Sequence, residues 1–135
     1  MARAGDTVEN AATGERITFV SIDDELLVMD AVWPRPGHRA VEHVHPGREE
    51  RWRVVAGQAT CRIGAEEVEA GPGDAVVAPA GTPHLAWNAA DGEVRLRIEM
   101  RPALRWAEFT ERLFRGDPPL ELLREFSQEI ALPVG

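Results

Sequence analysis

Three histidines and one glutamate are of the residue types that bind divalent transition metals. His43 and His45 are separated by one residue, so on a strand both imidazoles would leave the same face. Glu50 begins the next apolar segment, where it shares a face with Trp52, and its carboxylate can point into the same interior. Glu49 would point the opposite way. We therefore expect the first three side chains to converge on one point.

His84 lies far downstream, directly after the turn-forming segment 79–83. That turn could bring the start of a new strand across a barrel toward the other three residues. Three imidazoles and one carboxylate would leave one or two coordination positions open on a divalent first-row ion. An open position would allow substrate binding or ligand exchange at the metal.

The elements that must position these residues are short and rich in Val, Ile, Thr, Trp and Ala, with Gly, Pro and Asp between them. We expect strands at 16–22, 25–33, 41–44, 50–56, 59–63, 66–70, 75–78, 84–89 and 93–100. In the last of these, apolar and charged residues alternate from Val94 to Met100, which is typical of a half-buried strand. The sequence predicts an all-β domain, and the first ten to fifteen residues are expected to be poorly structured or an edge strand.

The pattern changes after Pro102. Apolar residues recur at helical spacing up to Gly116 and again after Asp117, until Pro133 ends the second stretch. We therefore expect one domain over residues 1–135, with a barrel at about 16–100 and a tail of two helices, at about 103–131, packed outside it.

Composition excludes several classes of function. The formal net charge of −8 and the lack of a basic cluster argue against a nucleic-acid partner. No apolar run approaches a membrane span, no secretory signal is visible at the start, and the single Cys61 cannot form an internal disulfide, so we expect a soluble, cytoplasmic protein. The chain contains neither Lys nor Tyr, which removes Schiff-base chemistry and a phenolic acid.

Two segments resemble the motifs of the cupin superfamily. Gly37 to Gly57 reads GHRAVEHVHPGREERWRVVAG and is similar to the first cupin motif, which selects Glu50 over Glu49 as its acidic residue. Gly73 to Asn88 reads GDAVVAPAGTPHLAWN and is similar to the second. With their spacer, the motifs cover residues 37–88, about two fifths of the chain.

This resemblance implies a double-stranded β-helix, or jelly roll, in which His43, His45, Glu50 and His84 take the ligand places of one metal ion. Cupins hold Fe, Mn, Ni, Zn or Cu on similar residues, and some have lost the metal, so the ion is left open. Asn88 would have a structural role. Jelly-roll edges and an amphipathic tail are also commonly covered by a second copy, so a homodimer is expected.

The expected substrate pocket is formed by inward-facing strand residues, namely Trp52, Cys61, Ile98 and Met100. For Cys61, packing is the main alternative. We expect an enzyme acting on a small, largely apolar metabolite, with dioxygen activation by Fe(II) as the first choice of chemistry. A redox-neutral isomerase, cyclase or lyase and a non-catalytic metal- or metabolite-binding module are the alternatives. The lack of Tyr argues against cupin sugar epimerases and Cys–Tyr thiol dioxygenases.

Overall fold

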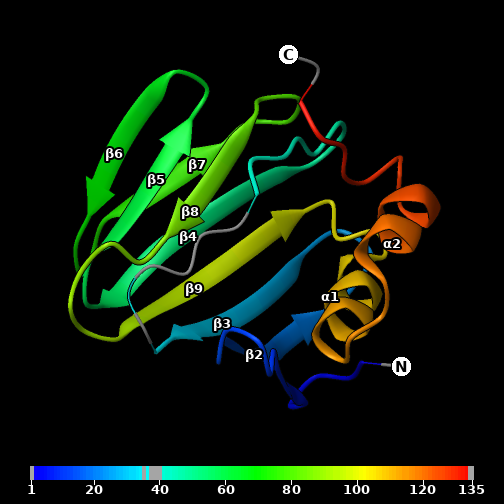
Figure 1. Ribbon diagram of the computed structural model, residues 1–135, viewed down its shortest axis with the longest axis horizontal. Helices are drawn as coiled ribbons and strands as arrows, with labels where there is room; N and C mark the ends of the chain where they lie inside the picture. Colours follow the sequence, from blue (N-terminus) through cyan, green and yellow to red (C-terminus); the bar gives the residue numbers. More distant parts are fainter. Residues whose placement is uncertain (1, 35, 37–40, 134–135) are drawn as a thin grey trace.

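The computed structural model describes residues 2–34, 36 and 41–133, so the start of the first motif, residues 37–40 with His38, lies outside the described residues. Within these ranges the chain forms nine strands and two helices (Figure 1). The strands are β1 (Thr7–Glu9), β2 (Arg16–Ile22), β3 (Leu27–Trp33), β4 (Glu49–Ala56), β5 (Ala59–Ile63), β6 (Glu66–Ala70), β7 (Ala75–Ala78), β8 (His84–Trp87) and β9 (Val94–Arg101). The helices are α1 (Trp106–Phe114) and α2 (Pro119–Glu125).

The strands form two antiparallel sheets. One has six strands in the order β1-β2-β3-β9-β4-β7, and the other has three in the order β6-β5-β8. Along β9 and the central part of β4, buried and more exposed side chains alternate, so Trp52, Val54, Leu96 and Ile98 all face the interior. The core therefore lies between the sheets, as expected for a jelly roll.

Most strand boundaries fall within two residues of those expected from the sequence. The prediction of a strand at 41–44 is wrong. This segment makes only isolated bridges, from His43 to His84 and from Val44 to Ala131. Its partners are the start of β8 and the C-terminal segment, neither of which extends far enough beside it to form a ladder. The N-terminal edge strand, one of the two alternatives for this region, is present as β1.

The C-terminal tail packs its apolar residues onto the rest of the core. Trp106 and Phe109 of α1 are buried together with Leu122, Phe126 and Ile130. The second helix ends at Glu125, earlier than the apolar pattern suggested, and the chain continues through turns that still bury Phe126 and Ile130. Among the described residues, no helix is long and apolar enough to cross a membrane.

Gly57 links β4 and β5 in a conformation that other residues rarely adopt. Its φ is +81°, and a Cβ would lie 2.4 Å from the carbonyl oxygen of Glu93. Gly81 has a φ of +80°, but a Cβ at that position would meet no atom within 4 Å.

We expect Gly57→Ala to lower the free energy of unfolding by more than the roughly 1–3 kcal/mol that the left-handed backbone alone costs, and Gly81→Ala to lower it only by that amount. Urea unfolding of both variants measures the difference, and equal losses would contradict the predicted clash.

Candidate metal centre and cavity

The four ligand candidates come together in the interior. His43, His45, Glu50 and His84 each offer one ligand atom, and these atoms all lie within 4.8 Å of one another. His45, Glu50 and His84 are buried, whereas His43 is partly exposed. His43 and His84 are held together by paired backbone hydrogen bonds of 3.1 and 2.9 Å between their segments. Residues separated by up to 41 positions thus meet at one point.

Each histidine ring is fixed by a backbone carbonyl. The Nδ1 atoms of His43, His45 and His84 lie 2.8, 2.9 and 2.9 Å from the carbonyl oxygens of Val41, Glu129 and Thr82. A carbonyl oxygen can only accept, so each Nδ1 carries a proton, and each Nε2 is the atom left to bind a metal ion or a second proton. This is the arrangement in which outer partners orient metal-binding imidazoles.

The donor set fits a cation at the centre of the cluster. The Nε2 atoms of His45 and His84 lie 3.1 and 3.2 Å from the same oxygen, Oε1 of Glu50. Because both Nδ1 atoms already carry protons, these Nε2 lone pairs would repel the carboxylate unless a proton or a metal ion lay between them. Three imidazole nitrogens and one carboxylate therefore provide a ligand set for a divalent transition metal.

Burial and mutual contact shift the pKa values of these groups. Burial lowers the pKa of His43 to about 4, although the charge of Glu50 opposes the shift, so this imidazole is neutral near pH 7. Burial alone would raise the pKa of Glu50, but hydrogen bonds from His45 and His84, which donate through Nε2 when these rings are protonated, hold it below its usual range. Glu50 in turn raises the pKa of His84 against the effect of burial. The carboxylate is thus ionised and ready to bind a cation.

A cavity of about 140 Å³ opens on one side of the cluster. His43 and Glu50 line it, whereas His45 and His84 are not among its described lining residues. Its walls are mainly apolar and aromatic, and they include Ile17, Met29, Trp33, Trp106 and Phe114. A small molecule in the cavity would therefore meet the metal site from the side of His43 and Glu50.

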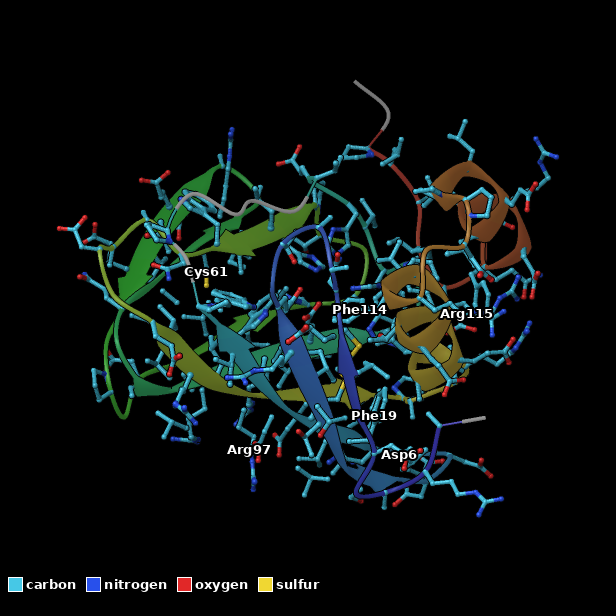
Figure 2. All side chains as sticks on the ribbon, turned by 60° about the horizontal axis from the view of Figure 1, so that its bottom comes forward. Asp6, Phe19, Cys61, Arg97, Phe114 and Arg115 are labelled. Carbon is cyan, nitrogen blue, oxygen red and sulfur yellow. The ribbon has the colours of Figure 1, made fainter. Side chains whose placement is uncertain are left out.

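The residues expected in the substrate pocket have different positions. Trp52, Ile98 and Met100 line the cavity, and their assignment to a substrate site stays a prediction. Cys61 is fully buried in the core and is not among the described lining residues. Figure 2 shows it well apart from Phe114, which does line the cavity. Burial raises the pKa of the Cys61 thiol to about 12, which suits packing better than reactivity.

Glu15 lines the same cavity, and the sequence interpretation missed it. Its Oε2 accepts a hydrogen bond of 2.7 Å from Nε1 of Trp33. Burial raises its pKa to about 7; the bond from Trp33 opposes the shift and the charge of Glu50 adds to it. In the sequence, Glu15 is one of many acidic residues beside a strand, and only the fold places it in the same cavity as Glu50.

Arg48 connects the centre to the helical tail. It is only 1% exposed, its Nε donates to the carbonyl oxygen of Pro102, and its Nη2 donates to that of Ala103 and to the carboxylate of Glu129. The backbone carbonyl of Glu129 is the group that accepts from His45. The ion pair thus fixes the tail segment that orients one of the ligand candidates.

Comparisons with known proteins agree with this architecture. A Thermus thermophilus structure matches with 28% identity and a TM-score of 0.63, covering 75% of this chain and 90% of its own. A cupin sugar phosphate isomerase from Silicibacter pomeroyi has 20% identity, a TM-score of 0.62 and coverage of 71% and 70%. A DMSP lyase from Ruegeria pomeroyi has 29% identity, a TM-score of 0.53 and coverage of 61% and 41%.

No curated protein matches the sequence at a significant level. The cupin domain family, however, matches residues 34–100, which include both histidine motifs and all four ligand candidates. The two antiparallel sheets and the cupin structures that resemble them agree with this match. This chain is a member of the cupin superfamily.

Proposed function

We propose that this cupin is a metal-dependent enzyme that acts on a small, largely apolar organic molecule. The observation that carries the proposal is that the cluster of His43, His45, Glu50 and His84 borders an apolar cavity. A metal enzyme needs both a held ion and a site for the reacting molecule, and this combination supports the proposal.

The cavity limits the size and charge of the substrate. Its volume of about 140 Å³ is close to that of an engineered cavity that binds benzene. No Arg is among the described lining residues, and the ionisable groups there are Glu15, His43 and Glu50. Among the described lining residues, a phosphate group would find no guanidinium to neutralise it. We therefore infer a compact substrate without phosphate, carrying at least one oxygen that can approach the metal.

The residues around the ion have separate tasks in this proposal. His43 and Glu50 lie on the open side and set where the substrate oxygen can approach. Trp52, Ile98 and Met100 exclude water, which strengthens electrostatic interactions in the site. When bound, Fe(II) would supply redox chemistry toward dioxygen, whereas Zn, Ni or Mn would supply Lewis acidity. Dioxygenase chemistry is the first candidate because the apolar walls suit a non-polar substrate.

A redox-neutral elimination or isomerisation is the second candidate, and Glu15 favours it. Such reactions need a group that takes and returns a proton, and a carboxyl with a pKa of about 7 in the same cavity can do both. The DMSP lyase, which is 29% identical over 61% of this chain, agrees with this second candidate. Oxygen consumption separates the two chemistries.

We expect the purified protein, loaded in turn with Fe(II), Mn(II), Ni(II) or Zn(II), to turn over at least one member of a panel of small phenols, diketones and hydroxyketones. Oxygen uptake matching product formation would support the dioxygenase, and turnover without uptake would support the redox-neutral enzyme. Glu50→Gln should lose the activity, while Arg53→Ala, at an exposed position of β4, should keep it. Equal activity in metal-loaded protein and in chelator-treated protein would contradict the proposal.

A further inference from the structure

We propose that Glu15 is the acid–base residue of the cavity and exchanges a proton with the molecule bound beside His43 and Glu50. The inference rests on the proposed function, because it assumes that a metal-bound ligand occupies this space. It goes further in assigning a role to a residue that lies outside both cupin motifs. Glu15 would be a catalytic residue that contacts the bound ligand without binding the metal.

Strand pairing and a hydrogen bond fix the position of the Glu15 carboxyl. It directly precedes β2, and Trp33 is the last residue of β3, which pairs with β2 so that Arg16 lies opposite Val32. The two side chains therefore come from the same end of one hairpin. The indole Nε1 of Trp33 donates to Oε2 of Glu15 over 2.7 Å, which orients the carboxyl. Both side chains line the cavity.

The size of the cavity places a bound ligand close to both the metal site and Glu15. Its volume of about 140 Å³ is enough for a group of roughly the size of benzene, and Glu15, His43 and Glu50 all line it. A ligand that fills this volume and approaches the ion beside His43 and Glu50 must also lie against Glu15. A proton can then pass directly between ligand and carboxyl without an intervening chain of water molecules.

Few other groups near the bound ligand could exchange a proton with it. The chain has no Lys and no Tyr, and Cys61 is not among the described lining residues. His43 and Glu50 belong to the metal cluster and would be occupied by the ion. Thr110 also lines the cavity, but a hydroxyl is a poor proton acceptor near neutral pH. Among the described lining residues, Glu15 is the carboxyl outside the metal cluster.

The transfer is redox-neutral and balanced. An O–H or C–H bond of the ligand breaks, its electron pair stays on the ligand, and the proton forms an O–H bond with Glu15. The reverse step returns the proton at a different atom in an isomerisation or to a leaving group in an elimination. The pKa of Glu15, raised to about 7 by burial, permits both directions near neutral pH.

Isothermal titration of the zinc-loaded protein with acetohydroxamic acid tests this inference without an enzymatic assay. The compound is smaller than benzene and binds metals as its anion, so its proton must go to the protein, to a hydroxide displaced from zinc or to the buffer. The observed binding enthalpy depends on the ionisation enthalpy of the buffer, and the slope of this dependence gives the number of protons released to the buffer. At about pH 8, Glu15 is ionised in the free protein, and the charge of the bound anion raises its pKa. We therefore expect wild type to release about one proton fewer per ligand bound than Glu15→Gln.

Two further variants complete the experiment. Glu9→Gln removes the same charge from an exposed position of β1 and should behave as wild type. Trp33→Phe keeps an aromatic wall but removes the hydrogen bond that lowers the pKa of Glu15, so the pH at which the protein stops keeping the proton should move upward. Equal proton counts in wild type and Glu15→Gln, or an unchanged midpoint in Trp33→Phe, would overturn the role of Glu15. Failure of the protein to bind zinc or the hydroxamate would instead overturn the proposed function.

Discussion

Glu50→Gln is expected to weaken zinc binding by more than about 100-fold. Loss of a group that only supports a ligand usually lowers metal affinity by about 10–100-fold, and loss of a ligand should lower it further. Glu50 supplies the negative charge of the cluster, and its Oε1 lies 3.1 and 3.2 Å from the Nε2 atoms of His45 and His84. Glutamine keeps the shape but removes the charge and leaves two imidazole lone pairs facing a neutral amide. Competition with a chromophoric chelator measures the affinity of wild type and variant.

Glu49→Gln is the matched control. Glu49 is the neighbouring carboxylate on the same strand, lies opposite Arg101 of β9, and is not part of the cluster. Its replacement should change zinc affinity by less than about threefold, because a partly exposed charge outside the cluster is largely screened. If the two variants lost affinity equally, the assignment of Glu50 as a ligand would be wrong.

Glu129→Ala is expected to destabilise the fold by about 3–5 kcal/mol and to weaken metal binding as well. The substitution leaves the guanidinium of Arg48, which is 1% exposed, without its anionic partner. One atom of that group, Nη1, already has no hydrogen-bond partner within the described structure. Loosening this segment also frees the carbonyl that orients His45, so zinc affinity should fall roughly 10–100-fold.

Urea unfolding of the metal-free protein and zinc titration test the two effects separately. Glu125→Ala provides the control, because Glu125 forms exposed ion pairs with Arg105 and Arg112 in the same tail, and solvent screening leaves such pairs with little effect on stability. In the double variant Arg48→Met/Glu129→Leu, neither buried charge remains, so much of the lost stability should return. A Glu129→Ala protein as stable as Glu125→Ala would contradict the structural role of the ion pair.

The parts of the fold that could be predicted depend on short-range patterns. Strand β9 was visible because apolar and charged residues alternate along it, and the same periodicity placed Glu50 and Trp52 on the inner face of β4. The segment 41–44 was wrongly assigned as a strand because its pairing depends on Ala131, which is remote in the sequence. Local pattern cannot reveal such a partner.

The candidate site was likewise predictable only in part. Residue spacing and the cupin motifs predicted which four side chains meet, because the motifs fix their places in the barrel. They could not identify Glu15 or Arg48, whose surroundings come from Trp33, Pro102 and Glu129. Cys61 was expected in the pocket from its strand parity alone, yet parity selects a face and not a depth along the barrel.

Anomalous X-ray diffraction from crystals of the zinc-loaded protein, recorded above and below the zinc absorption edge, tests the central claim most directly. The four-residue site predicts one strong difference peak per chain, within about 2.0–2.2 Å of the Nε2 atoms of His43, His45 and His84 and of a carboxylate oxygen of Glu50. Protein that takes up zinc but shows the peak elsewhere, or shows none between these residues, would contradict the site and the function proposed for it.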